Sequence, residues 1–241
     1  MSGHSKWHSI KHKKGVADAR RGAVFTKLGN AIAIAAREGA DPESNFRLRL
    51  AIDQAKAANM PNANIDKSIA RGSGASGGEQ IQEVTYEGYG PGGIAIIVES
   101  ATDNKNRTYA DIRTAFTKNG GNMAEAGAVA FQFNRRGIIT IESDDAESVE
   151  LAAIDAGAED IFTDGEEVSV YTAATDLKKV QEQLREHKIV SAELGYVPKN
   201  TIMIDDSSAA QKAIKLMDAL EDLDDVSNTY SNLDIDPDLK L

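Results

Sequence analysis

The sequence predicts an α+β protein: an N-terminal three-helix domain followed by two two-layer α+β (ferredoxin-like) domains, one inserted in the other. Three observations lead to this prediction. Apolar residues recur at helical spacing in residues 16–72, strand and helix signals alternate from residue 81 onward, and a glycine- and serine-rich stretch at 72–78 separates the two regions. A length of 241 residues and a hydrophobic fraction of 41% are sufficient for more than one packed core.

Three helices are predicted in the first region. Apolar periodicity indicates the first, an aspartate followed by proline fits the N-cap and first position of the second, and a Met-Pro break precedes the third. The expected elements are Val16–Glu38 with Gly39 as its C-terminal cap, Asp41–Asn59 opened by Asp41–Pro42, and a helix from Asn62 or Asn64 to Gly72.

The second region alternates between strands and helices. Its strands are indicated by alternating or continuous apolar residues, and its helices by i, i+3 and i+7 spacing. The expected elements, in order, are strands Ile81–Tyr89 and Ile94–Ser100, helix Asn104–Asn119, strands Val129–Asn134 and Gly137–Glu142, helix Ala146–Ala156, strands Glu159–Phe162 and Glu167–Tyr171, helix Asp176–His187, strands Val190–Val197 and Thr201–Ile204, helix Ser208–Leu220 and strand Val226–Tyr230.

The order of these elements predicts an insertion. Residues 137–197 contain a complete βαββαβ unit, which is the ferredoxin-like order. The segments before and after it cannot each close a sheet, but together they can form one two-layer domain. The predicted parts are a flexible basic arm (1–15), a helical domain with its linker (16–78), a discontinuous α+β domain (79–135 plus 199–241) and an inserted ferredoxin-like domain (136–198).

Charge is divided unevenly along the chain. The protein has a net charge of −11, yet residues 1–72 carry 13 basic and 6 acidic side chains, whereas residues 73–241 carry 14 and 32. One end should therefore attract polyanions that the remainder repels. Cysteine is absent, which excludes disulfides and thiolate metal sites. No apolar run approaches the length of a membrane span, so we expect a cytoplasmic protein with no membrane partner.

Several long motifs then give the chain a family resemblance. They are GHSKWHSIKHKK at 3–14, NMPNANIDKSI at 59–69, YEGYGPGGIAIIVE at 86–99, TDNKNRTYADIR at 102–113 and FTKNGGNM at 116–123. In this order they resemble the YebC/PmpR family, which includes a mitochondrial translational activator, and the resemblance spans essentially the whole chain. The resemblance implies three domains and no known catalytic activity. It also implies a protein that acts in contact with nucleic acid, either as a DNA-binding transcriptional regulator or as a ribosome-associated factor that relieves stalling.

The arm is the leading candidate for nucleic-acid contact. Its lysines and arginines can neutralise phosphates, and its tryptophan or a histidine can stack on an unpaired base. The alternative is a solvated tail. Histidines 4, 8 and 12 also have a spacing at which a helix could hold a metal, but glycine and neighbouring lysines oppose this, so no metal or cofactor is expected. The candidate residues are Lys6, Trp7, His8, Lys11, His12, Lys13, Lys14, Arg20 and Arg21.

Two loops of the middle region have both a structural and a functional interpretation. The turn Gly88–Gly93 could approach a phosphate, although a hairpin turn that needs positive φ is the favoured explanation. Lys105 and Arg107 lie at a helix N-terminus, where a phosphate could bind; the alternative is an N-cap formed by Asp103 or Asn104. We add Lys105 and Arg107 to the candidate nucleic-acid-binding residues.

Other patterns argue against catalysis. Gly72, Gly74 and Gly77 match a dinucleotide-binding motif, but a helix precedes them and a strand follows, which is the reverse of what that motif requires. Two of the three aspartate pairs, at 144–145, 205–206 and 224–225, directly precede predicted helices and are interpreted as caps. No histidine or serine pattern accompanies them, so no enzyme is predicted.

The sequence thus predicts a non-enzymatic regulator of gene expression that binds ribosomal RNA or promoter DNA. An RNA or ribosome target suits a flexible arm better, because binding then needs only shape, phosphates and stacking. A DNA-binding transcriptional regulator is the alternative, although no clear helix-turn-helix is present. A small-molecule-sensing α+β module is the second alternative and rests on analogy of fold alone.

Overall fold

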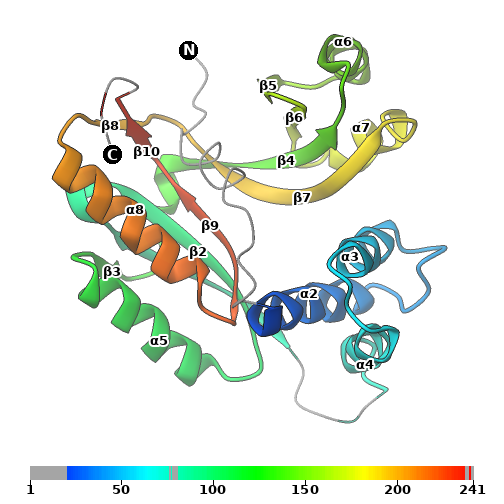
Figure 1. Cartoon of the computed structure of the whole chain (residues 1–241), viewed down its shortest axis with the longest axis horizontal. Helices are drawn as coiled ribbons and strands as arrows, with labels where there is room; N and C mark the ends of the chain where they lie inside the picture. Colours follow the sequence, from blue (N-terminus) through cyan, green and yellow to red (C-terminus); the bar gives the residue numbers. More distant parts are fainter. Residues whose placement is uncertain (1–20, 76, 78–80, 237–238, 240–241) are drawn as a thin grey trace. The chain divides into compact units, whose positions relative to one another are not determined.

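The computed structural model describes residues 21–75, 77, 81–236 and 239 (Figure 1). Contacts divide this part of the chain into two compact units. The smaller unit is residues 132–201, and the larger unit joins the described residues up to 131 to those from 202 onward. The architecture is α+β with a helical N-terminal part, which confirms the predicted fold class.

The larger unit begins with three helices around a small apolar core. The helices are α2 (Arg21–Ala36), α3 (Phe46–Ala57) and α4 (Asn62–Gly72). Their buried core includes Ile32, Leu48 and Ile65. The end of α4 lies directly against α2, because a Cβ added at Gly72 would fall 2.0 Å from the carbonyl oxygen of Ala33. A glycine at this position therefore sets how closely the two helices approach.

The N-cap predicted for the second helix was wrong. The helix begins at Phe46, and Asn45 caps it: its Oδ1 accepts from the N–H of Leu48 at 3.0 Å. The same side chain donates to the carbonyl oxygens of Ala35 and Gly39, at 2.7 and 2.8 Å. Asn45 therefore pairs backbone groups at the start of α3 and around the end of α2 that have no partner within these helices. Aspartate could not do both, because its carboxylate has no donor.

The rest of the larger unit is a four-stranded antiparallel sheet with two helices on one face. Its elements are β1 (Gln82–Tyr89), η2 (Pro91–Gly93), β2 (Ala95–Thr102), α5 (Lys105–Lys118), β3 (Asn122–Ala124), β8 (Ile202–Ile204), α8 (Ser207–Glu221), β9 (Val226–Ser231) and β10 (Leu233–Ile235). The strand order is β3-β1-β2-β9, and β8 and β10 form a separate parallel pair. α5 and α8 pack on Ile96 and Val98, with Phe116 and Met217 fully buried between the layers.

The helical part packs against the other face of this sheet. Ala33 and Ile34 of α2 form a buried cluster with Ile81 and with Ala101 of β2. The amide of Asn30, also on α2, donates to the carbonyl oxygen of Ala101 at 3.2 Å. α2 is thus shared between the helical core and the sheet.

The smaller unit is a four-stranded antiparallel sheet with two helices on one face. Its elements are η3 (Ala130–Gln132, which begins just before it), β4 (Phe133–Glu142), α6 (Ala146–Ala156), β5 (Asp160–Asp164), β6 (Glu167–Ala173), α7 (Leu177–Gln183) and β7 (Lys188–Pro198). The strand order β5-β6-β4-β7 is the ferredoxin-like arrangement that the βαββαβ pattern predicts. Ile139 and Val170 of the sheet pack under Val149 and Leu184.

Two predicted strands differ from the structure for one physical reason. Residues 129–134 do not form a strand of their own; η3 precedes a single continuous strand, β4, that begins at Phe133. The N–H groups of Val129 and Ala130 donate to the carboxylate of Glu87, so they are not available to a strand ladder. The short strands β3 and β10, of three residues each, carried too little periodicity to be predicted.

Candidate nucleic-acid interface

Most of the predicted arm lies outside the described residues. This holds for Lys6, Trp7, His8, Lys11, His12, Lys13, Lys14 and Arg20. Arg21 is the first residue of α2, and its side chain likewise lies outside the described part. The role of these nine residues therefore remains a prediction.

The structure places Lys105 and Arg107 at the start of α5 in different electrostatic situations. Asn104 caps the helix by accepting from the N–H of Arg107 at 3.1 Å, as one of the two interpretations predicts. The Arg107 guanidinium donates to Asp225 at 2.8 Å and to Asp103 at 3.0 Å. The hydrogen bond with Asp225 raises the pKa of Arg107 above its ordinary value. Lys105 is exposed and forms no ion pair with any residue the structure describes.

Asp225 is the centre of this network. Its carboxylate also accepts from the hydroxyl of Thr108 at 2.7 Å and lies 3.3 Å from the hydroxyl of Thr102; both threonines are buried. The backbone of Asp225 is fixed in turn, because its carbonyl oxygen accepts from the N–H of Ala101 at 2.8 Å. The network joins the start of α5 to the loop before β9. An anion bound at this helix N-terminus would meet an arginine whose charge is already balanced.

The two arginines of α3 are similarly occupied. Arg47 on α3 lies 3.2 Å from Glu38 and 3.6 Å from Glu83. Arg49 donates to the carbonyl oxygens of Pro42 and Glu43, at 3.1 and 2.9 Å. The positive charge of this region is therefore partly neutralised within the protein.

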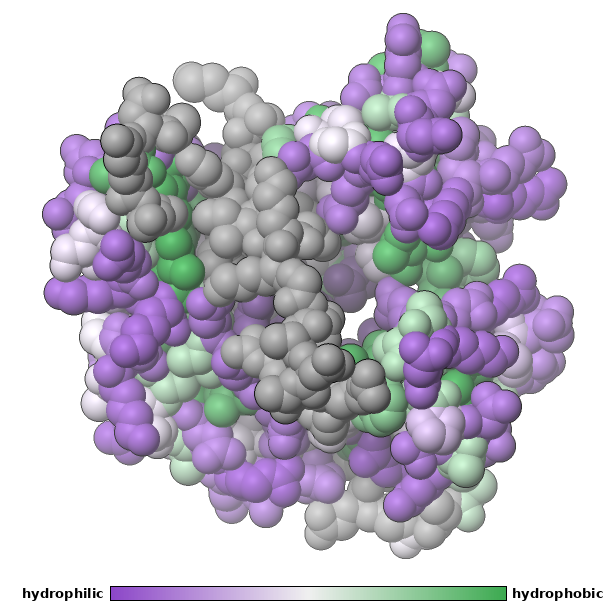
Figure 2. All heavy atoms as spheres, viewed as in Figure 1, coloured by the Kyte–Doolittle hydropathy of each residue, from purple (hydrophilic) through white to green (hydrophobic). Residues whose placement is uncertain are grey.

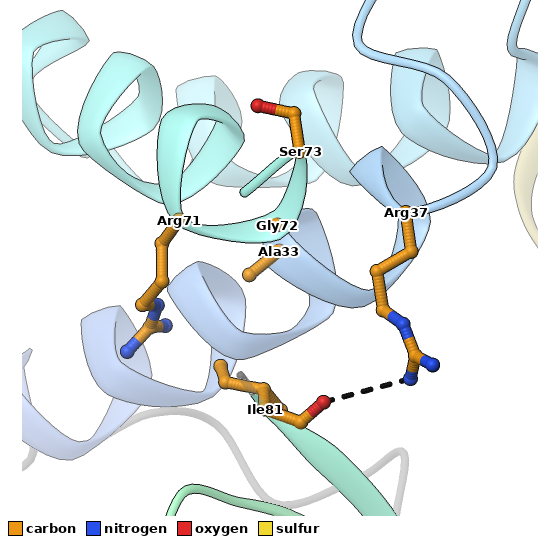
Figure 3. Close-up of a pocket in the computed structure, with 6 residues that line it drawn as sticks. All are labelled: Ala33, Arg37, Arg71, Gly72, Ser73 and Ile81. Atoms are coloured by element: carbon orange, nitrogen blue, oxygen red, sulfur yellow. Dashed lines mark hydrogen bonds between the residues drawn. The ribbon is translucent and has the colours of Figure 1, made fainter. Parts of the chain in front are cut away.

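A cavity of about 210 Å³ is found within the larger unit (Figure 3). It is lined by α2, by the last turn of α4 and by the residue before β1; the lining residues are Ala33, Arg37, Arg71, Gly72, Ser73 and Ile81. Figure 3 shows the two arginine side chains on either side of Ala33 and Ile81, with Arg37 directed at the carbonyl oxygen of Ile81, a distance of 3.5 Å. Two guanidinium groups give the cavity a positive character.

Arg71 links the helical part to the sheet. Its guanidinium donates to Oδ1 of Asn30 at 2.8 Å, and Asn30 passes a hydrogen bond on to Ala101 of β2. Burial lowers the pKa of Arg71, and the charge of Asp103 only partly opposes this. The cavity holds no carboxylate or imidazole among the described residues, and the hydroxyl of Ser73 donates to Ala70. This part of the chain therefore gives it no acid–base pair and no activated nucleophile.

Glu87 is a buried acid that the sequence did not single out. It is only 6% exposed, and its carboxylate accepts from the N–H groups of Gly127, Val129 and Ala130 at 2.7, 2.7 and 2.8 Å. Burial alone would raise the pKa of Glu87, but these three hydrogen bonds outweigh it and hold the pKa below its ordinary value. The available signal was an acidic residue in the strand that leads into the turn Gly88–Gly93.

The glycine-rich segments have structural roles in the part of the chain described. Gly92 and Gly93 both have φ near +77° in the turn between β1 and β2, as the hairpin interpretation predicts. α4 precedes the glycine- and serine-rich stretch and β1 follows it, which is the order that argues against dinucleotide binding. Asp145 and Asp206 cap α6 and α8, as predicted, by accepting from Ser148 and Ala209.

Other kinds of site are not found in the described residues. No group of three or more histidine or acidic side chains there is arranged to hold a metal ion. No described helix has the length and apolar character needed to cross a membrane. Hydrophilic residues cover most of the visible face of each unit in Figure 2.

The fold and these sites define a class: an α+β protein with a helical N-terminal part and a cavity flanked by two arginines. Family descriptions agree with this. The TACO1/YebC N-terminal domain matches residues 5–75, and the TACO1/YebC second and third domain matches residues 81–233. The chain therefore belongs to the TACO1/YebC family, as the motif resemblance indicated.

Individual relatives match over nearly their whole length. A "probable transcriptional regulatory protein" of Herpetosiphon aurantiacus is 51% identical over 99% of this chain and 97% of its own. One from Halothermothrix orenii is 50% identical over 98% and 96%. The crystal structure of a conserved hypothetical protein from Aquifex aeolicus is 44% identical, with a TM-score of 0.89 over 98% of this chain and 99% of that one. The two curated relatives are thus named as regulatory proteins.

Proposed function

We propose that this protein is a cytoplasmic, non-enzymatic regulator of gene expression that binds nucleic acid through its basic N-terminal arm. The observation that carries the proposal is the charge division: residues 1–72 carry a net charge of +7 and the remaining residues −18. A polyanion attracted to the first region is repelled by the second, so the charge division orients the molecule on its target. The names of the relatives support a regulatory role.

Within this proposal we favour RNA, on the ribosome, with assistance to stalled translation as the outcome. The arm offers cations together with Trp7, which suits phosphates and unpaired bases. The alternative is a transcriptional regulator that binds promoter DNA, which the names of the relatives favour. We also propose that the chain has four parts. They are the arm (1–15), the helical domain with its linker (16–78), the discontinuous α+β domain (79–135 with 199–241) and the inserted domain (136–198).

A sedimentation experiment tests the choice of target. Full-length protein is sedimented with purified ribosomes across a salt series. In parallel, a gel-shift assay measures whether the same protein binds promoter DNA. Sedimentation with ribosomes supports the translation role. A shift of promoter DNA without sedimentation supports the transcriptional role. If the protein neither sediments with ribosomes nor shifts DNA, the proposal as a whole is overturned.

Substitutions in the arm test its part in binding. We expect replacement of Lys11, Lys13 and Lys14 together by alanine to weaken binding. The slope of log K against log salt concentration should become shallower by up to about 2–3 units, because a protein that neutralises fewer phosphates releases fewer counterions. An unchanged slope would remove the arm from the mechanism. Trp7→Ala should weaken binding to single-stranded RNA more than to duplex DNA, by about 1–3 kcal/mol if the indole stacks.

A further inference from the structure

Helix α5 carries mainly basic charged side chains, whereas residues 73–241 as a whole carry a net charge of −18. Residues 105–118 contain Lys105, Arg107, Arg113 and Lys118 against one acid, Asp111. Arg107 is neutralised by Asp225 and Asp103, as described above. Lys105, Arg113 and Lys118 are exposed, and none of them forms an ion pair with a residue that the structure describes. Their charge is therefore available to a partner.

Three of the exposed side chains form a row along one flank of the helix. Lys105, Tyr109 and Arg113 are spaced i, i+4 and i+8, so each follows the last by about 6 Å along the axis and about 40° around it. Asp111 lies two residues from Tyr109, which is about 200° around the helix and on the opposite flank. The row is thus an aromatic ring between two cations, with no acid of α5 beside it.

The ring of Tyr109 is held in place and still accessible. It is 45% exposed, and the buried ring of Tyr86 packs beside it at a centroid distance of 6.3 Å and a tilt of 58°. Tyr86 is fixed in turn by β1 and by a hydrogen bond from its hydroxyl to the carbonyl oxygen of Lys105 at 3.4 Å. A supported aromatic face loses little entropy when a base stacks on it.

We propose that the flank of α5 formed by Lys105, Tyr109 and Arg113 binds single-stranded RNA. The ring of Tyr109 stacks on one unpaired base, and the two cations hold phosphates on either side of it. A duplex keeps its bases stacked on one another and has none to offer the ring, so the row suits an unpaired strand better than duplex DNA. This inference rests on the proposed function, because it adds a second contact to the one that the arm makes.

Binding of a labelled RNA is the direct test, measured by fluorescence anisotropy on the full chain. The probe is a mixed-sequence single strand of about 12 nucleotides, within the range that stacking platforms cover, and a DNA duplex of equal length is the comparison. Tyr109→Ala should weaken RNA binding about five-fold or more and duplex binding much less. Arg113→Gln should reduce the salt slope by about 0.7, the value for one phosphate of a single strand.

Two controls and one independent test variant make the result interpretable. Lys212→Gln removes an exposed lysine from α8 in the same unit and should change little. Tyr109→Phe keeps the ring and should retain binding, which separates stacking from the hydroxyl. Arg113 is exposed, so Arg113→Gln tests the row even if Tyr109→Ala disturbs the packing on Tyr86.

The outcomes separate this inference from the proposed function. If the unaltered chain binds neither probe, the proposed function fails. If the chain binds RNA and responds to the lysines of the arm, but not to Tyr109→Ala or Arg113→Gln, only the α5 site is overturned. An equal loss on RNA and duplex after Tyr109→Ala would also overturn it, because stacking on an unpaired base predicts a difference.

Discussion

α3 and α5 are both basic helices of the larger unit, yet the two arginines of α3 are engaged by the fold whereas Lys105 and Arg113 of α5 are not. The arginines of α3 are held by nearby carboxylates and carbonyl oxygens, with Arg47 between Glu38 and Glu83. Lys105 and Arg113 of α5 have no such partners among the described residues. Positive charge that the fold itself neutralises contributes little to attracting a polyanion, because a ligand must first displace the existing partner. The number of cations in a segment therefore does not measure its capacity to bind.

The strongest case of an engaged charge is Glu87, and its replacement should have the largest effect. Glu87→Gln keeps the shape of the side chain but replaces one accepting oxygen by a donating NH₂. That NH₂ would then face backbone N–H groups, which are donors as well. We expect a loss of about 2–3 kcal/mol in local stability. Hydrogen exchange of the segment 125–131 measures it directly, since the amides of Gly127, Val129 and Ala130 should exchange faster.

The effect of Glu87 should depend on pH in a defined direction. Its pKa is lower in the folded protein than in the unfolded chain, so its carboxylate stabilises the fold above the unfolded value of about 4.3. This contribution is lost as the pH falls through the folded-state pKa. The difference between the protein and Glu87→Gln should therefore shrink in acid. Glu83→Gln, an exposed change on the same strand, should show neither effect, and equal behaviour of the two variants would contradict the role of Glu87.

The second largest effect is expected where an engaged cation loses one of its two partners. Asp225→Ala removes the shorter of the two ion pairs of Arg107, leaving the one with Asp103, and also removes an acceptor for the buried Thr108, so we expect a stability loss of about 1–2 kcal/mol. The same change should strengthen nucleic-acid binding and steepen its salt slope by up to about 0.7. Asp224→Ala is the matched control, since it removes an exposed neighbouring carboxylate that is not bonded to Arg107. If both variants strengthen binding equally, net charge alone is responsible.

The smallest effect is expected at Arg47. Arg47→Gln removes a half-exposed arginine that is already paired, so we expect less than about 0.5 kcal/mol in stability and less than about a two-fold change in RNA affinity. Anisotropy with the same RNA probe gives a comparison with Arg113→Gln. An equal loss at the two positions would show that pairing does not govern which cations bind, and the contrast between α3 and α5 would fail.

Local features of the fold followed from the sequence. α6 has the predicted limits, Ala146–Ala156, and α4 begins at Asn62, one of the two predicted starts, and ends at Gly72 as predicted. The caps at Asn104, Asp145 and Asp206 followed too, because each side chain accepts from an N–H three residues ahead. Such bonds form within a single turn, so the sequence specifies them directly. The charge division and the family motifs also followed directly from the amino-acid sequence.

Only the tertiary structure decided which charges are free. Arg107 and Asp225 are 118 residues apart and meet because β2 pairs with β9, which brings Asp225 beside Ala101 and the start of α5. Glu87 meets the N–H groups of a loop 40 or more residues away for a similar reason. Contacts of this kind depend on sheet register and on how layers pack, and no local pattern encodes them. The sequence determined where the cations lie, and the fold determined which of them remain available to a ligand.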